Sequence, residues 1–135
     1  MTFEEDEFMA MQGDVIAQVN LANDYYNGEI VEKDYAKAVV WYTKAANQGN
    51  DIAQFNLATM YDRGQGVRQN YSKAMEWYTK AANQGKATAQ YNLAIMYEEG
   101  QGVRQDSAIA KEWFGKACDN GFQKGCDNYR ILNQR

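Results

Sequence analysis

The chain has 135 residues, of which 45% are hydrophobic and 24% are charged, so it fits one globular domain and not a disordered or fibrous chain. The formal net charge of −4 opposes nucleic-acid binding, because proteins bind polyanions mainly through clustered Lys and Arg. No apolar run approaches the roughly 18 residues that span a bilayer. The start, MTFEEDEFMAMQGD, is acidic and unlike a signal peptide, so we expect no membrane insertion.

A period of 36 residues runs through the sequence. Trp41, Trp77 and Trp113 are spaced at this interval, and residues 51–86 and 87–122 are identical at about half of their positions. Periods of this length are typical of arrays of stacked helical hairpins, so we predict a single repeat domain over residues 1–135. Its predicted parts, in chain order, are an N-terminal capping helix at 3–14, repeats at 15–50, 51–86 and 87–122, and a C-terminal capping half-repeat at 123–135.

Each repeat is expected to begin with a helix that has two apolar sides. In the second repeat, the segment IAQFNLATMYD places Ala53 and Leu57 on one side and Ile52 and Phe55 on another, both at helical spacing. A lone hairpin cannot bury both sides, but stacked hairpins can.

A second helix is expected to follow in each repeat. The segment YSKAMEWYTKAANQG has one apolar stripe that includes Trp77 and Tyr78. Asn70 precedes it as the expected N-cap, and Gly85 stands just past its end.

Glycine-rich loops, YDRGQGVRQ at 61–69 and YEEGQGVRQ at 97–105, separate the two helices of the last two repeats. A phosphate-binding loop follows a strand and leads into Lys-Ser or Lys-Thr, whereas a helix precedes these loops and Gly-Val-Arg-Gln ends them. We interpret them as tight turns in which Gly64 and Gly66 supply positive φ.

The pattern A-Q-F-N-L-A-x-M-Y-x-x-G-x-G-V, followed by K-A-x-x-W-Y-x-K-A-A-x-Q-G, resembles the Sel1-like repeat, a relative of the tetratricopeptide repeat. The resemblance covers nearly the whole chain. It implies an all-α fold, a right-handed α-solenoid of helix-turn-helix repeats whose first helices line a concave groove, and a role as an adaptor in protein complexes. The chain departs from the pattern at Glu29-Ile30 in the first loop and at Ser107, before the last second helix.

Cys118 and Cys126 are eight positions apart, across a predicted turn. The spacing is similar to that of a cysteine-rich, secreted bacterial branch of the family, in which such pairs form disulfides. The alternative is two reduced thiols in the core, because Cys118 occupies a position that is alanine in the other repeats. A zinc site is disfavoured, since two thiols with no His leave it short of ligands, and we expect no metal or other cofactor.

Carried over by register, the groove of the related repeats would be lined by first-helix positions that face away from the second helix. These positions vary between repeats while the packing positions do not, as expected of a surface that reads a specific partner. They are Ile16, Val19, Asn23, Tyr26 and Asn27 in the first repeat, Ile52, Phe55, Thr59, Asp62 and Arg63 in the second, and Thr88, Tyr91, Ile95, Glu98 and Glu99 in the third.

The composition of this predicted groove indicates the chemistry of its ligand. Val19, Phe55 and Tyr91 would form an apolar ladder, beside an acidic rim that contains Asp62 and residues 98–99. Apolar anchors inside a polar rim are typical of protein interfaces. We therefore expect a protein or peptide partner that presents apolar and basic residues; the oligomeric state is left open.

The sequence offers little for catalysis. It has no His, the usual proton carrier near neutral pH, and adjacent Glu98 and Glu99 point in different directions on a helix. The prediction is a non-catalytic interaction module. Two alternatives stay open: an inhibitor or immunity protein that occludes one dedicated partner, and a weak β-lactam-binding protein or hydrolase of cell-wall amides, an activity attributed to the cysteine-rich branch.

The compartment is left open by the sequence. A bridged cysteine pair, in a chain whose signal peptide has been removed, would indicate the periplasm or secretion, and reduced cysteines would indicate the cytoplasm.

Overall fold

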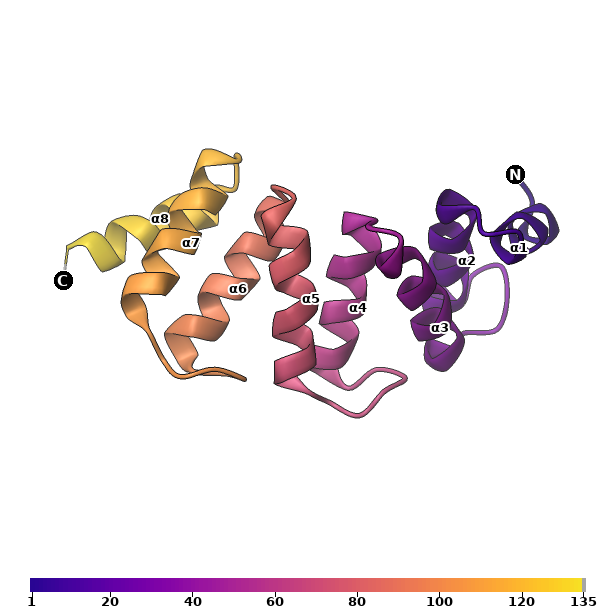
Figure 1. Ribbon diagram of the computed structural model, residues 1–135, viewed down its shortest axis with the longest axis horizontal. Coiled ribbons are helices and arrows are strands. Elements are labelled where there is room, and N and C mark those ends of the chain that lie inside the picture. Colours follow the sequence, from indigo (N-terminus) through magenta and orange to yellow (C-terminus); the bar gives the residue numbers. More distant parts are fainter. Residues whose placement is uncertain (135) are drawn as a thin grey trace. The chain divides into compact units, whose positions relative to one another are not determined.

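The computed structural model describes residues 1–134, which form eight helices and no strand (Figure 1). This confirms the predicted all-α class. Within the described residues, no helix combines the length and apolarity needed to cross a bilayer. The helices are α1 (Phe3–Met11), α2 (Val15–Asn27), α3 (Tyr35–Asn47), α4 (Asp51–Arg63), α5 (Tyr71–Asn83), α6 (Ala87–Glu99), α7 (Ser107–Asp119) and α8 (Gln123–Asn133).

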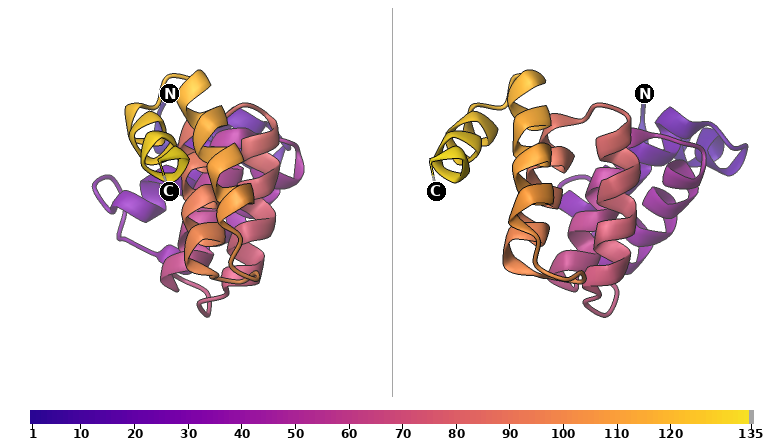
Figure 2. Two further views of the ribbon diagram at one scale, coloured as in Figure 1. Left: turned by 90° about the vertical axis from the view of Figure 1, so that its left-hand side faces the viewer. Right: turned by 60° about the vertical axis from the view of Figure 1, so that its left-hand side comes forward.

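The chain forms two compact units, Met1–Gln69 with α1 to α4 and Asn70–Arg135 with α5 to α8. In the first unit α1 packs on α2, α2 on α3 and α3 on α4; in the second, α5 packs on α6, α6 on α7 and α7 on α8. Figure 2 shows α6 and α7 side by side. Within each unit, helices that are consecutive in sequence are therefore neighbours in space, as in an array of helix-turn-helix repeats.

Short polar side chains begin the second helices. Asp34, Asn70 and Asp106 each accept a hydrogen bond from the backbone N–H three positions later, at 3.0 Å. Such a cap satisfies a donor that the first turn of a helix leaves unpaired. The predicted cap at Asn70 is confirmed, and the cap at Asp106 starts α7 at Ser107 despite the departure from the repeat pattern there.

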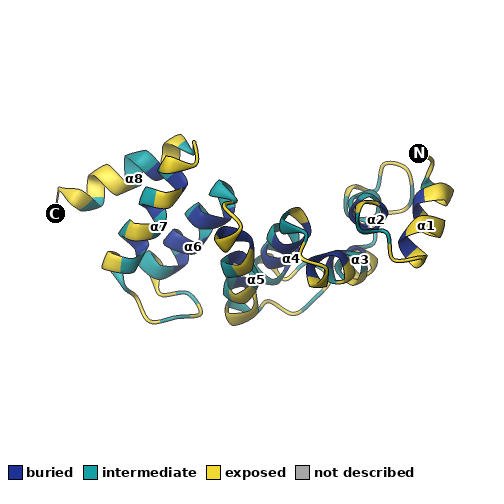
Figure 3. Cartoon of the chain, turned by 45° about the horizontal axis from the view of Figure 1, so that its top comes forward, coloured by how far each residue is buried: buried dark blue, intermediate teal, exposed yellow. Residues whose placement is uncertain are grey.

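Small side chains fill the joints between helices. Leu21, Leu57 and Leu93 recur at the 36-residue interval and are buried, and most of the other buried positions are alanine. Figure 3 shows that buried and exposed positions alternate along the helices. Alanine lets two helix backbones approach closely, and such close contacts leave little room for bulky side chains. The buried alanines are Ala10, Ala17, Ala22, Ala38, Ala45, Ala46, Ala53, Ala58, Ala74, Ala81, Ala82, Ala89, Ala94, Ala110 and Ala117.

A buried glutamine ties each of three first helices to the end of the helix before it. Gln18, Gln54 and Gln90 donate through Nε2 to the backbone carbonyl eight residues earlier, at 3.0 to 3.2 Å. These carbonyls lie in the last turns of α1, α3 and α5, where a helix leaves its oxygens without an internal partner. The bond thus satisfies two buried polar groups at once.

The glycine-rich loops are turns, as predicted. Gly64 and Gly66 have φ of 68° and 72°. Gly66 also lies against the backbone of Tyr35, where a Cβ would come within 2.5 Å of the carbonyl carbon. The Gln69 side chain closes the loop by donating to the carbonyl oxygen of Asp62 at 2.8 Å. Only glycine fits at position 66.

The first loop lacks this close approach. Ile30 stands where the later loops have their second glycine, and it is 68% exposed. A side chain is therefore accommodated at position 30, where the later loops need glycine.

Cys118 and Cys126 form a disulfide that joins α7 to α8. They stand 36 residues after Ala82 and Gln90, so a covalent bond occupies the place of a glutamine-to-carbonyl hydrogen bond. The helices approach closely here because Gly125 has no side chain: a Cβ would lie 2.9 Å from a backbone oxygen of α7.

We predict that Gly66→Ala destabilises the protein more than Gly49→Ala. Both glycines have positive φ, which costs a side chain roughly 1–2 kcal/mol, but a Cβ at Gly49 would meet nothing within 4 Å. The clash with Tyr35 should add about 1–3 kcal/mol. Urea unfolding followed by circular dichroism measures both, and equal losses would contradict the close approach.

Replacing both cysteines, with Cys118→Ser and Cys126→Ser, should lower the free energy of unfolding by roughly 2–3 kcal/mol, the chain-entropy value for so short a loop. Dithiothreitol should lower the stability of the wild type to that of the double variant and leave the variant unchanged. The prediction is wrong if the reduced and oxidised wild type melt at the same temperature.

Candidate functional site

In the first unit, the predicted binding residues of α2 differ in how far they reach the surface. Ile16 is 57% exposed and Asn27 is exposed, whereas Val19 is 7% exposed. Tyr26 is half-buried, and its hydroxyl donates to Oε1 of Gln65 at 3.3 Å. Val19 therefore lies beneath this surface, and the side chains around it provide the accessible area.

The Tyr42 hydroxyl connects α2, α3 and α4. Tyr42 is 2% exposed; its hydroxyl donates to Oδ1 of Asn23, and Asn56 hydrogen-bonds to the same group. Burial raises the pKa of Tyr42 to about 12, with the Asn56 hydrogen bond opposing the shift and the nearby Tyr26 adding to it. The phenol is therefore protonated at neutral pH and serves to hold Asn23 and Asn56 in place.

On α4, the predicted residues form a surface that is apolar at one end and charged at the other. Ile52 is 46% exposed, and Phe55 and Thr59 are half-buried. Asp62 is half-buried and Arg63 is exposed at the end of the helix. Burial raises the pKa of the Asp62 carboxyl, and the Arg63 guanidinium opposes that shift.

In the second unit, part of the predicted surface of α6 is taken up by packing. The Tyr91 ring lies 5.5 Å from Phe114 and 5.0 Å from Phe122, both edge-on, and Ile95 packs on the same cluster. Glu99 is exposed, and Thr88 and Glu98 are half-buried. The accessible part of this surface is therefore more acidic than apolar.

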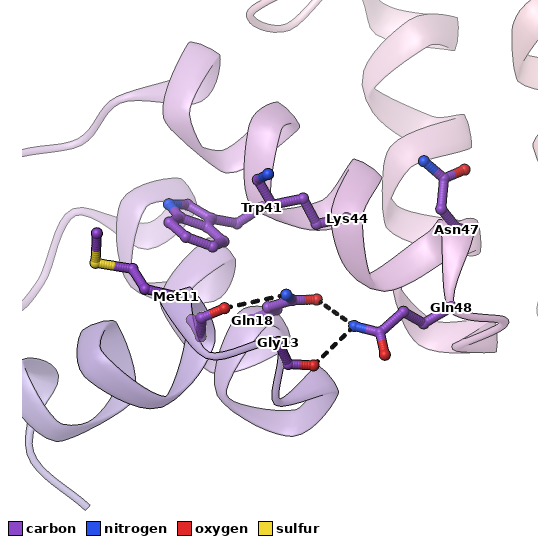
Figure 4. A pocket seen from close by; sticks show the side chains of 8 residues that line it. Met11, Gly13, Gln18, Trp41, Lys44, Asn47 and Gln48 are labelled. Carbon is purple, nitrogen blue, oxygen red and sulfur yellow. Dashed lines mark hydrogen bonds between the residues drawn. The ribbon is translucent and has the colours of Figure 1, made fainter.

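A hollow of about 570 Å³, which sequence reasoning missed, lies among α1, α2 and α3 (Figure 4). Lys44 lies over the Trp41 ring at 5.8 Å from its centre. Gln48 donates through Nε2 to the Gly13 carbonyl at 3.0 Å and to Oε1 of Gln18 at 2.9 Å.

The polar groups of this hollow hydrogen-bond to one another and hold neighbouring helices together. In the second unit Asn120 donates through Nδ2 to Oε1 of Gln90 at 2.9 Å, the same contact in the same repeat positions as Gln48 and Gln18. The recurrence of glutamine at positions 18, 54 and 90 is the sequence signal that could have revealed it.

The described residues offer little that is chemically reactive. No three His, Cys, Asp or Glu side chains within residues 1–134 gather closely enough to hold a metal ion. Both cysteines are in the disulfide and present no free thiol.

Helices paired in sequence order, in an array that repeats every 36 residues, define a helical-repeat protein of the α-solenoid class. The Sel1 repeat model matches residues 15–50, 51–86 and 87–122, and the chain belongs to the Sel1 repeat family. Sel1 repeats typically act as protein–protein interaction modules and are generally non-catalytic. No curated protein matches the chain.

Solved structures of the same family resemble this one. A protective antigen of uropathogenic Escherichia coli that displays an SLR fold is 38% identical with a TM-score of 0.89, over 93% of this chain and 27% of its own. A Sel1 repeat protein of Oxalobacter formigenes is 34% identical with a TM-score of 0.86, over 90% of this chain and 50% of its own. The present chain thus spans half or less of these two relatives.

The fold is also that of cysteine-rich protein B of Helicobacter pylori. That protein is 19% identical with a TM-score of 0.74, over 93% of this chain and 92% of its own. At this identity the likeness concerns the fold alone.

We predict that Asp62→Asn stabilises the protein at pH 7. Burial raises the pKa of Asp62, so this group stabilises the fold below the unfolded value near 4, and the contribution is lost as the pH rises through the folded pKa. At pH 7 the charged carboxylate is thus a cost that asparagine removes. Thermal melts from pH 7 down to pH 3 should show a gain that disappears on acidification; a less stable variant at pH 7 would contradict this.

Proposed function

We propose that this chain is a non-catalytic interaction module that binds a segment of a partner protein through the surface of its first helices. One contrast within the sequence carries the proposal. Asn27, Arg63 and Glu99 occupy one exposed position and differ in every repeat, whereas the buried position five residues before them is alanine in all three. Packing is reused from repeat to repeat, but a surface that reads one partner must change along its length.

The chemistry of the surface supports a partner segment with both apolar and basic residues. Ile52 and Phe55 offer apolar area on α4, with Asp62 at the end of the same helix. Glu98 and Glu99 end α6 in the corresponding place. Carboxylates around apolar anchors steer a basic partner and limit the choice of partners.

The reactive groups of the chain support a role without catalysis. The sequence has no His, the described cysteines are bonded to each other, and burial moves the pKa of Tyr42 still further above neutral pH. General acid–base catalysis works best with a group whose pKa lies near the working pH.

The test compares two charge reversals of equal size. Asp62→Lys with Glu99→Lys changes the first helices, and Glu76→Lys with Glu112→Lys makes the same change at exposed positions of the second helices. Partners captured from lysate and envelope fractions are identified, purified and titrated against both variants. The first pair should weaken binding by roughly tenfold or more, because like charges at an interface cost several kcal/mol, and the second should leave it within about twofold.

Circular dichroism should confirm that both double variants are folded. Equal weakening by the two pairs would mean that net charge drives binding, and weakening by the second pair alone would move the interface to the second helices. Either outcome contradicts the proposal.

A further inference from the structure

Asp6, in the first turn of α1, is a buried acidic residue. It is 5% exposed, and its Oδ1 is buried and has no hydrogen-bond partner within residues 1–134. The other buried polar side chains, Gln18, Gln54 and Gln90, all donate to helix carbonyls. The start of a helix favours negative charge, but a buried carboxylate oxygen with no hydrogen-bond partner is still costly, so its presence calls for an explanation.

The Asp6 carboxylate lies close enough to that of Asp24 on α2 for the two to repel each other. The two helices pack antiparallel: Phe3 meets Tyr25 edge-on at 5.8 Å, and Ala10 packs near the start of α2. This register places Asp6 opposite the turn that holds Asp24. Burial, and then the negative charge of Asp6, raise the pKa of Asp24, as expected for two close carboxylates.

The fold itself does not require this pair. Thirty-six residues later the same two positions hold Tyr42 and Met60, which are 2% and 0% exposed, and the following copy holds Tyr78 and Met96, which are also buried. Uncharged side chains thus fill these positions in the rest of the chain. Of these three copies, only the one between α1 and α2 carries two like charges at these positions.

Within residues 1–134, neither Asp6 nor Asp24 forms an ion pair with a basic side chain. Neither α1 nor α2 contains Lys or Arg. On α3, which packs against α2, Lys37 lies over the Tyr25 ring at 5.3 Å and Lys44 over the Trp41 ring. Glu4, Glu5 and Glu7 on α1 add further negative charge. What the site lacks is a positive group.

We propose that Asp6 and Asp24 together form a receptor for one cationic side chain, an arginine, of a bound protein. This rests on the proposed interaction function and adds a specific contact on the joint between α1 and α2. Asp24 is half-buried, so the guanidinium enters from its side, while Asp6 forms the base of the site. The planar guanidinium has five N–H donors, enough to satisfy two carboxylates at once, and it is desolvated more easily than an ammonium group.

The test uses a probe that needs no partner protein. Aspartate labelled with 13C at the carboxyl carbon is observed by NMR while N-acetylarginine amide is added at millimolar concentrations. The signals of Asp6 and Asp24 should shift saturably, and those of the capping residues Asp14 and Asp34 should not. N-acetylcitrulline amide, which has nearly the same shape without the charge, should leave all four signals in place.

Matched variants locate the site. Asp24→Asn should weaken the response of the Asp6 signal at least tenfold, and Glu29→Gln, which removes an exposed carboxylate of the same unit, should leave it unchanged. Because Asp24 is half-buried, its variant should stay folded even if Asp6→Asn disturbs the packing of α1.

Three results would overturn the proposal: an equal response to arginine and citrulline, a response of the pair no larger than that of other aspartates, or saturation by Ca²⁺ or Mg²⁺ at concentrations well below those of the arginine probe, which would indicate a metal site. If instead the arginine response is present but no partner depends on the first-helix charges, the receptor stands and the proposed function fails.

Discussion

A glutamine side chain buried at the joint between two hairpins fixes how the helices stack. Alanine surfaces alone would let one helix slide along another, because they are flat and alike. The Nε2 donors of Gln18, Gln54 and Gln90 each require the carbonyl oxygen in the last turn of the preceding helix. A slipped joint would leave both groups buried and unpaired, at roughly 1–3 kcal/mol for each. The register of the first helices on the helices that precede them follows from this bond.

The sequence predicts the hairpins, the caps and the turns because these depend on neighbouring residues. Asn70 caps its helix and Gly66 takes positive φ as expected. The exposure of individual side chains depends on helices that follow later in the chain. Val19 and Tyr91 occupy equivalent positions in their repeats, and the sequence predicts that both line the groove. In the structure Val19 is buried, and the Tyr91 ring packs against Phe114 and Phe122. The 36-residue register shows which side of a helix a residue occupies, but not how much of that side is covered.

The burial of one acidic residue between α1 and α2 could not be predicted from the sequence for the same reason. Asp6 lies within a run of four acidic residues, a composition typical of a solvated helix surface. Only the packing of α1 on α2 reveals that one of the four is buried and lies near Asp24. Burial raises the pKa of Asp24 and of Asp62, so at both positions the chain keeps an acidic group where folding alone would not favour its charge.

The disulfide has a consequence for how the chain assembles. The loops at 61–69 and 97–105 are nearly identical, so a folding chain can pair a helix with the wrong copy of its neighbour, a characteristic error of repeat proteins. The chain has two cysteines, which are eight positions apart, so they can meet as soon as the segment between them turns, before the other helices have paired. Oxidation at that stage keeps α8 beside α7 and removes the pairing of α8 with an earlier copy of α7 from the possible errors.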